Sequence, residues 1–292
     1  MNIQSLSISV PAECTNQCCF CVARMHREDY PNQIENNKRF TDLYMDDYMA
    51  RLSFARDNGC NTVMLTGNGE PLLNREFLLK FALWNKSLSS PFKWIELQTS
   101  GTLLDDEYLR FLRNTVHVNT ISLSLSSIFT SQKNAEYNRT KHGLTVDIAK
   151  LCKEIKIYDF NLRLSLNMTD EYNGINPMSI FSVAASLNAD QITFRKLYES
   201  GTAVDSPENS WIREHRCTDA DFKKIADYVK ACGTPLEILP FGATKYSIHN
   251  FGVVIDEDCM SEELKGDAVK YLILRENCKL YSKWDDKNSL IF

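Results

Sequence analysis

Hydrophobic and polar positions along this chain follow two alternating periods, one typical of strands and one typical of helices. Short apolar or period-two runs predict six strands, at residues 5–10, 62–66, 94–98, 120–125, 161–167 and 191–195. Apolar residues at helical spacing predict helices between them, at residues 41–58, 75–88, 105–113, 144–155 and 178–187. Such alternation predicts an α/β fold with a parallel sheet and right-handed crossovers. Six strands are fewer than the eight of a closed barrel, so we expect an open or partial barrel.

The pattern changes after about residue 200. The expected elements there are a loop, a helix and three period-two strands, at residues 201–210, 219–230, 246–255, 269–274 and 279–284. We therefore divide the chain into a barrel core over residues 1–200 and a C-terminal part over residues 201–292. We expect this C-terminal part to be a helix with a small β-rich cap, packed on the mouth of the barrel.

Composition is that of an ordinary soluble globular protein, with 292 residues, 43% of them hydrophobic and 24% charged. No apolar run approaches the roughly 20 residues that cross a bilayer. Residues 1–5 do not resemble the start of a signal peptide, so we expect a cytoplasmic protein with no membrane partner. The net charge of −5 argues against a long nucleic-acid partner, because such binding depends on many basic residues.

Three cysteines follow the first expected strand with the spacing C-x3-C-x2-C: Cys14, Cys18 and Cys21. In a cytosolic chain, clustered thiols are better explained as metal ligands than as disulfides. Iron–sulfur clusters normally take four cysteine ligands. Three thiolates can therefore hold three irons of a [4Fe–4S] cluster and leave the fourth open, which is typical of a chemical rather than a structural site. The alternative is a zinc site, with Cys19 or a distant histidine as the fourth ligand.

A second motif, Gly67-Asn68-Gly69-Glu70-Pro71, follows the second expected strand. It lies at the same carboxyl edge of the sheet as the cysteines, where α/β proteins build their sites. Glycines let the backbone approach a ligand closely. Exposed carbonyls and the Glu70 carboxylate are acceptors, which suit a ligand ammonium group. The alternative is a tight turn without a binding role.

With Phe20 as the aromatic residue before the last cysteine, the two motifs together resemble the radical S-adenosylmethionine (radical SAM) superfamily over roughly residues 5–200. The resemblance implies a partial (β/α)6 barrel. It implies two cofactors, a [4Fe–4S] cluster on Cys14, Cys18 and Cys21, and SAM, whose amino and carboxylate groups chelate the open iron. It also implies that an electron from the reduced cluster cleaves SAM, and that the 5′-deoxyadenosyl radical then abstracts a hydrogen atom from a substrate. An electron donor such as flavodoxin or ferredoxin is the implied partner.

The resemblance assigns further residues to the SAM site. The turn from Gly67 to Glu70 matches the motif that holds the SAM amino group. Thr99-Ser100-Gly101, after the third expected strand, resembles a Thr-Asn-Gly turn that lines the SAM pocket, with Ser100 in place of Asn.

Four residues at later strand ends extend this site. Ser124 and Ser126 match positions that contact the SAM carboxylate or ribose, and Asn167 can bind the ribose. Arg195 can bind the SAM carboxylate or an anionic substrate group, because guanidinium suits bidentate recognition. The alternatives are strand-end hydrogen bonding for the first three and a structural ion pair for Arg195.

The cysteines after residue 200 are Cys217, Cys232, Cys259 and Cys278. They lack the closely spaced pairs that mark auxiliary clusters in relatives of the superfamily. We therefore expect them to be buried thiols, and we expect one cluster in the chain. The resemblance accordingly does not extend to peptide maturases or sulfatase-activating enzymes with a cysteine-rich C-terminal extension.

Three hypotheses of function follow. In the first, the protein is a radical SAM enzyme acting on a small polar or nucleotide-like substrate. In the second, the same chemistry acts on a peptide or protein, which an exposed strand-pairing edge would favour. In the third, the protein is an iron–sulfur, SAM-binding sensor without turnover.

Overall fold

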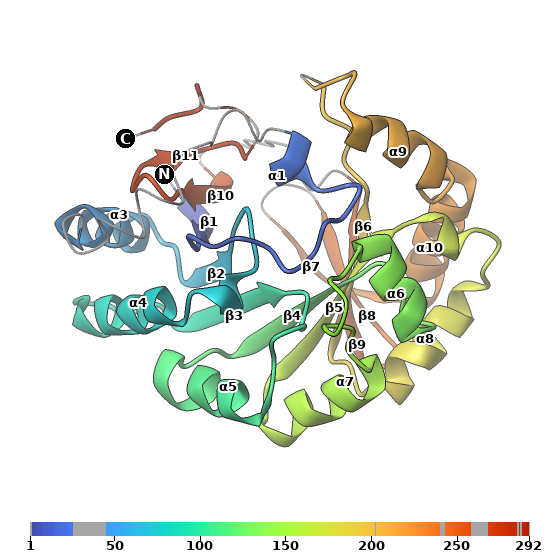
Figure 1. The fold of residues 1–292 in the computed structure, drawn as a ribbon, viewed down its shortest axis with the longest axis horizontal. Helices are drawn as coiled ribbons and strands as arrows, with labels where there is room; N and C mark the ends of the chain where they lie inside the picture. The colour runs from blue at the N-terminus through green and yellow to red at the C-terminus, as the bar shows by residue number, and fades with distance from the viewer. Residues whose placement is uncertain are drawn as a thin grey trace.

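The computed structural model describes residues 2–25, 45–201, 203–239, 243–257, 268–284, 286 and 288–291. Six parallel strands form its centre (Figure 1): β1 (Asn2–Ser9), β2 (Thr62–Thr66), β3 (Trp94–Thr99), β4 (Thr120–Leu125), β5 (Asn161–Met168) and β6 (Gln191–Lys196). They pair in sequence order, each parallel to the next. All six expected strands are present, and their ends agree with the sequence pattern to within a few residues.

Helices cover the outer face of these strands (Figure 1): α3 (Met45–Asp57), α4 (Arg75–Ser87), α5 (Asp106–Phe111), α7 (Ile148–Ile157), α8 (Pro177–Ser186) and α10 (Asp219–Cys232). A π-helical turn, η3 (Leu112–Val116), continues α5, and single 3-10 turns are η2 (Pro71–Leu73) and η4 (Asp170–Tyr172). Side chains that accept hydrogen bonds from the first turn fix several helix starts, as Asn74 does for α4 and Asp147 for α7.

The two faces of each strand differ in polarity. On β5, Leu162, Leu164 and Leu166 are buried against the helices, while Arg163 and Ser165 line a cavity inside the barrel. Apolar burial against helices stabilises the outer layer. The polar residues face inward, so the inside of the barrel is a polar space and not a second core.

The remaining strands are β7 (Thr234–Ile238), β8 (Thr244–Ile248), β9 (Phe251–Asp256), β10 (Ala268–Leu274) and β11 (Leu280–Tyr281). They extend the same sheet at both edges, in the order β11-β10-β1-β2-β3-β4-β5-β6-β9-β8-β7. The sheet is mostly parallel and does not close, which confirms the partial-barrel expectation.

The expected cap on the mouth of the barrel is replaced by these edge strands. Strand β9 pairs parallel with β6. Strand β10 pairs parallel with β1, and in this pairing Leu6 lies opposite Leu272. The outer strands of a six-stranded sheet have unpaired backbone groups, and strand addition satisfies them. The boundary at residue 200 stays a prediction.

Four elements, three helices and one strand, were not expected from the sequence. Helix α9 (Pro207–His215) begins inside a predicted loop, with Ser206 as its capping residue. Helix α6 (Ser131–Asn138) is polar and lacks a long apolar stripe, and α1 (Val22–Met25) is a single turn after the cysteines. Strand β7 is exposed along its whole length, so no alternation of buried and exposed residues marks it as a strand. Among the described helices, none combines the length and apolar character of a membrane span.

Candidate active site

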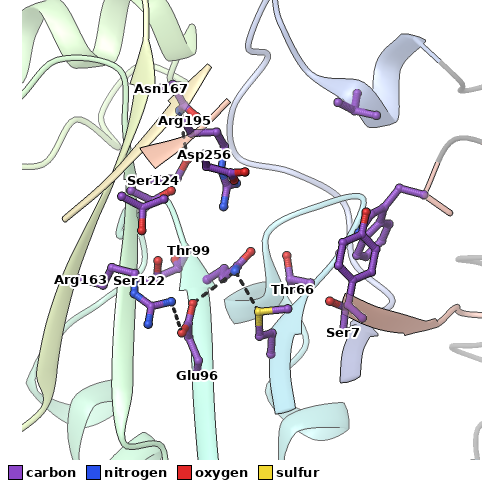
Figure 2. A pocket seen from close by; sticks show the side chains of 18 of the residues that line it. Ser7, Thr66, Glu96, Thr99, Ser122, Ser124, Arg163, Asn167, Arg195 and Asp256 are labelled. Carbon is purple, nitrogen blue, oxygen red and sulfur yellow. Dashed lines mark hydrogen bonds and ion pairs between the residues drawn. The ribbon is translucent and has the colours of Figure 1, made fainter. Parts of the chain in front are cut away.

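One cavity of about 690 Å³ runs from the cysteine loop into the barrel. Figure 2 shows side chains of the barrel that line it. The cavity is lined by nearly all the residues that the sequence assigned to the site: Cys14, Cys18, Phe20, Cys21, Gly67, Asn68, Gly69, Glu70, Thr99, Ser100, Ser124, Asn167 and Arg195. Ser126 is the one assigned residue that does not line it. The carboxyl ends of the strands therefore bring both motifs to one space, as the strand order predicts.

The cysteine loop holds its three motif thiols partly buried. Burial raises the pKa of all three thiols, and for Cys18 the charges on Cys21 and Cys14 raise it further. The Cys18 thiol donates to the carbonyl of Asn138 at 3.5 Å. Three neighbouring soft sulfur donors on one loop fit an iron–sulfur cluster. Within the described ranges, no three His, Cys, Asp or Glu side chains gather to hold a single metal ion.

The glycine motif packs directly on the cysteine loop. The Glu70 amide donates to the carbonyl of Glu13 at 2.8 Å. A Cβ atom on Gly69 would lie 2.0 Å from the carbonyl oxygen of Ala12, closer than any side chain can approach. Glycine is therefore required here so that two backbones can meet, and the close approach is to the protein's own chain.

The Glu70 carboxylate connects the second and third turns of the site. Glu70 is 2% exposed and accepts from the Thr99 hydroxyl at 2.6 Å and from the Ser100 amide at 2.9 Å. The Ser100 hydroxyl also donates to it, at 2.6 Å. Both carboxylate oxygens thus have protein donors, and backbone carbonyls of the motif are left as the acceptors for a ligand.

Polar side chains at the ends of β4, β5 and β6 form the next part of the wall (Figure 2). The Asn167 amide donates to the Ser124 hydroxyl at 3.1 Å. Asn167, Arg195 and Asp256 share one level of the sheet. Arg195 Nε is buried without a hydrogen-bond partner and lies 3.8 Å from an Asp256 oxygen.

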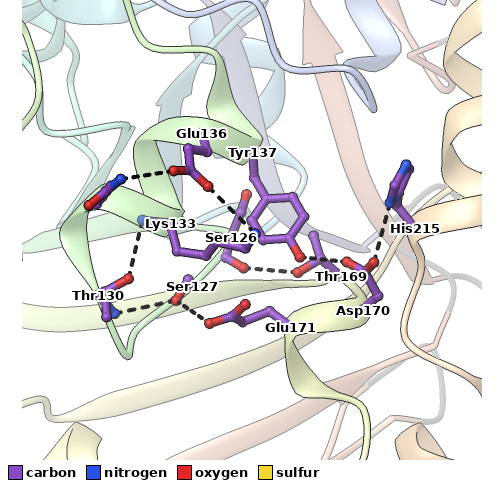
Figure 3. Close-up of polar contacts among 11 residues, drawn as sticks. Ser126, Ser127, Thr130, Lys133, Glu136, Tyr137, Thr169, Asp170, Glu171 and His215 are labelled. Carbon is purple, nitrogen blue, oxygen red and sulfur yellow. Dashed lines mark hydrogen bonds and ion pairs between the residues drawn. The ribbon is translucent and has the colours of Figure 1, made fainter.

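Ser126 does not line the cavity but is hydrogen-bonded to residues of its wall. It is fully buried, its hydroxyl donates to the Asn138 side chain at 2.7 Å, and it accepts from the Asn167 amide at 3.4 Å. Its carbonyl accepts from the Thr169 hydroxyl at 3.0 Å (Figure 3). Ser126 therefore positions two residues of the cavity wall, and the SAM contact that the resemblance implies for it stays a prediction.

Asn138 is a site residue that the sequence did not reveal. It ends α6, lines the cavity and contacts Cys18 through its carbonyl. No motif marks it, because its place depends on a polar helix that only the tertiary structure brings to the cysteine loop.

Charged side chains also line the barrel below Ser124, Asn167 and Arg195. Arg163 forms an ion pair with Glu96 and donates to Gln191 at 2.8 and 2.6 Å. Near the upper edge, Lys270 of β10 lies 4.0 Å from Asp256 of β9. In the sequence, these residues could have been identified as the inward-facing positions of the period-two strands.

Helix α9 lies over the cysteine loop. The rings of Phe20 and Trp211 are 5.7 Å apart, and Arg24 forms a 3.2 Å ion pair with Glu208. At the other end of α9, His215 Nδ1 lies 3.2 Å from an Asp170 oxygen (Figure 3). These contacts fix α9 beside the cluster motif.

A tyrosine joins the same network. The Tyr137 hydroxyl donates to the second oxygen of Asp170 at 2.5 Å. Burial and this hydrogen bond hold the pKa of Tyr137 well above its usual range. Asp170 therefore links α6 and α9.

The other cysteines are distributed unevenly. Cys217 and Cys278 are buried, whereas Cys232 is exposed at the end of α10, contrary to expectation. Cys259 lies outside the described residues. Cys19 is partly exposed and does not line the cavity.

Comparison with known proteins adds to this geometry. Residues 8–172, more than half of the chain, match the Radical SAM superfamily. No curated protein matches the chain. A solved structure of native anSMEcpe with bound AdoMet and Cp18Cys peptide is 12% identical, with a TM-score of 0.55, over 98% of this chain and 75% of that chain.

Two further structures are similar in fold. Native anSMEcpe with bound AdoMet is 15% identical, with a TM-score of 0.53, over 78% of this chain and 59% of that chain. Coproporphyrinogen III oxidase (HemN) from Escherichia coli, described as a radical SAM enzyme, is 12% identical, with a TM-score of 0.51, over 80% of this chain and 54% of that chain. The superfamily uses a [4Fe–4S] cluster and SAM, for which the thiol loop and acceptor-rich turns of this chain are suited. The chain belongs to the radical SAM superfamily.

Proposed function

We propose that this protein is an enzyme that cleaves SAM reductively and abstracts a hydrogen atom from a small polar or nucleotide-like substrate. The observation that carries the proposal is the single cavity shared by the cysteine loop, the glycine motif and the polar barrel interior. When bound, the cluster and SAM supply one-electron cleavage of the sulfonium S–C5′ bond, which yields methionine and a carbon radical.

The cavity wall supplies the binding groups. Cys14, Cys18 and Cys21 would hold the cluster, and backbone carbonyls of the glycine motif would accept from the SAM ammonium. Ser124 and Asn167, already joined by a hydrogen bond, would bind the ribose or carboxylate. Each of these roles follows from the family motif and from the lining of the cavity.

The barrel interior supports a polar substrate. The volume of about 690 Å³ lies within the usual range for small-molecule sites. Gln4 and Ser165 line it, and among the described residues the Gln4 side-chain oxygen and the Ser165 hydroxyl are buried without a hydrogen-bond partner. Buried polar atoms are normally paired, so these two retain unused hydrogen-bonding capacity beside the cavity. Arg195 adds a guanidinium that can bind an anionic group.

The edges of the barrel can keep water away from a radical. Helix α9 covers the cysteine loop through Trp211 and Glu208. On the opposite side, the Lys270 ammonium of β10 lies 4.0 Å from an Asp256 oxygen of β9, across the open side of the sheet. Exclusion of water and stray hydrogen donors protects reactive intermediates.

The proposal is tested by anaerobic reconstitution of the cluster, followed by addition of dithionite and SAM. We expect 5′-deoxyadenosine and methionine in equal amounts. Replacing Cys14, Cys18 and Cys21 with Ala abolishes the visible cluster absorbance and the products, whereas the exposed Cys232→Ala control retains both. SAM binding with an intact, reducible cluster and no cleavage would instead favour the sensor hypothesis.

A second candidate, a peptide substrate, is favoured by the β7 edge. β7 ends the described sheet, and its Leu236 and Ile238 are 58% and 74% exposed. Glu237 and Leu239 line the cavity, so a peptide strand added to β7 would run beside it. The anSMEcpe structure above holds a peptide.

The two substrate classes can be separated by the variant L236K/I238K. If the substrate is a peptide, these changes lower the stimulation of 5′-deoxyadenosine formation by a peptide pool. If it is a small molecule, a filtrate of small metabolites stimulates the wild type and the variant equally.

A further inference from the structure

Glu276 carries a buried carboxylate in the turn between β10 and β11. It is 1% exposed, and its Oε1 accepts from the Ser9 hydroxyl at 2.5 Å and from the Asn68 side-chain amide at 3.2 Å. Ser9 ends β1, shortly before the cysteine loop, and Asn68 is the middle residue of the Gly-Asn-Gly turn that follows β2. One carboxylate oxygen therefore joins chain segments at the ends of three strands.

Glu276 lies outside residues 8–172, which match the radical SAM superfamily. It reaches the site because β10 pairs parallel with β1, which pairs parallel with β2, so the carboxyl ends of the three strands meet at one edge of the sheet (Figure 1). Of the residues in this contact, Asn68 lines the cavity, whereas Glu276 and Ser9 do not. An effect of Glu276 on a ligand in the cavity must therefore pass through Asn68.

The glycine turn needs an anchor at this point. Backbone hydrogen bonds fix it on both sides, at the carbonyl of Thr66 and at the amide of Glu70. Residues 67–69 lie between them, and two of the three are glycines, which restrict the backbone less than any other residue. In the described part of the chain, the hydrogen bond from Asn68 to Glu276 is the one that holds these three residues.

We propose that Glu276 is a positioning residue for SAM: it holds the Asn68 side chain and so fixes the direction of the backbone carbonyls that accept from the SAM ammonium. The inference rests on the proposed function, which places the ammonium at the glycine motif. A turn that is already ordered loses less conformational freedom when its ligand binds, so the ligand binds more tightly. Loss of the anchor should accordingly lower the affinity for SAM more than the rate at which bound SAM is cleaved.

The first test measures the Kd of SAM on the reconstituted protein by equilibrium dialysis. We expect Glu276→Met, which keeps the length of the side chain and removes the acceptor, to raise the Kd about tenfold. Glu276→Gln keeps an oxygen that can accept from both donors, so its Kd should stay within about threefold of the wild-type value.

The matched control is Asn85→Ala. Asn85 is also buried, and its side chain accepts from the amide of Phe92 at 2.8 Å and donates to the carbonyl of Phe92 at 3.4 Å. It lies on α4 and does not line the cavity. The control should lower the melting temperature as Glu276→Met does but keep the wild-type Kd. An unchanged Kd in Glu276→Met, or an equal rise in the control, would overturn the inference.

A double-mutant cycle shows whether Glu276 acts through Asn68. Asn68→Ala removes the donor, leaves the carboxylate in place and should raise the Kd by a similar factor. The double variant E276M/N68A should then bind SAM no more weakly than N68A, because both changes remove the same contact. If the two factors multiply in the double variant, Glu276 acts by another route and the inference fails.

An exchange of donor and acceptor provides a test that does not depend on the folding of E276M. The variant N68D places a second carboxylate beside Glu276, and the repulsion should weaken SAM binding. Adding E276Q restores a hydrogen bond with its direction reversed, since the Ser9 hydroxyl can accept as well as donate. E276Q/N68D should recover most of the affinity that N68D loses, and no recovery at equal iron content would contradict the positioning role.

Turnover separates this inference from the proposed function. With dithionite as the reductant, E276M should raise the KM for SAM and keep the kcat for 5′-deoxyadenosine formation close to the wild-type value. A lower kcat with an unchanged KM would argue against positioning. A wild type that binds SAM without cleaving it would count against the proposed function, and the Kd values of the variants would still decide the role of Glu276.

Discussion

Ser100 donates two hydrogen bonds to one oxygen of the Glu70 carboxylate, one from its amide at 2.9 Å and one from its hydroxyl at 2.6 Å. Glu70 belongs to the turn after β2, and Ser100 belongs to the turn after β3. The two turns that wall the proposed SAM site are thus held together by one buried carboxylate. Any change at Glu70 should affect both turns at once.

Replacing Glu70 with Ala should weaken SAM binding and destabilise the fold. The change leaves the Thr99 and Ser100 donors without a buried acceptor, and hydrogen bonds to charged groups are worth about 1.5–3 kcal/mol each. We expect a loss of about 3 kcal/mol or more in the free energy of unfolding, measured with urea. The exposed control Glu107→Ala, which removes a surface ion pair with Arg75, should cost about 1 kcal/mol or less.

Replacing Gly69 with Ala should disturb the cysteine loop itself. The new Cβ would meet the carbonyl oxygens of Ala12 at 2.0 Å and Glu13 at 2.4 Å, and backbone atoms must then move apart. We expect iron content after reconstitution to fall to less than half. Gly201→Ala is the control, because nothing lies within 4 Å of its added Cβ. Full iron loading of the Gly69 variant would show that the loop tolerates the displacement.

Removing one partner of the Glu96–Arg163 ion pair should lower the free energy of unfolding considerably. Glu96 is 7% and Arg163 28% exposed at the side chain, so Glu96→Ala leaves a largely buried guanidinium whose remaining hydrogen-bond partner among the described residues is Gln191. We expect a loss of about 3 kcal/mol in stability. The double variant E96L/R163M, which removes both charges, should recover most of that loss in urea unfolding. Equal stability of E96A and the double variant would contradict this explanation.

The thiols outside the cluster motif should react in order of burial. Burial raises the pKa of Cys60 and Cys278 from the ordinary 9.0 to about 11, and that of Cys152 to about 12. Because the thiolate is the nucleophile, these cysteines should resist iodoacetamide at pH 8, while the exposed Cys232 reacts first. Peptide mapping by mass spectrometry measures the order.

The same pKa shifts predict alkaline instability. Between pH 9 and about 11 the unfolded chain releases thiol protons that the folded chain retains. The free energy of unfolding is therefore unaffected by these groups below pH 9 and falls as the pH rises above it. Urea unfolding at pH 8 and pH 10 tests this, and a C60A variant should show a smaller decrease.

Much of the barrel could be predicted from the sequence because its strands have two distinct faces. In β5 the leucines at 162, 164 and 166 alternate with polar residues, which fixes the strand and its inward face. Periodicity does not identify the pairing partner of a strand, however. Nothing in residues 269–274 indicates that this strand pairs with β1, so the edge strands were expected as a cap.

The candidate site, like the fold, could be predicted from the sequence only in part. The two motifs come directly after strands, where the direction of the chain is known, and both line the cavity. Ser126 lies one residue past the end of β4, where alternation no longer predicts direction, and it is buried behind Asn138 and Asn167 instead of lining the cavity. Asn138 and Trp211 reach the cysteine loop from helices whose docking depends on long-range contacts.

The pairing of β1 with β10 sets an order of events during synthesis. On one edge β1 pairs with β2, which follows soon after it in the sequence, but its neighbour on the other edge, β10, begins only at Ala268. Contacts that are distant in sequence form late, because the intervening chain must first be ordered. The strand that leads into the cysteine loop therefore has one edge unpaired until β10 has been made. Loading of iron and sulfide into a settled loop is accordingly a step that follows the synthesis of β10.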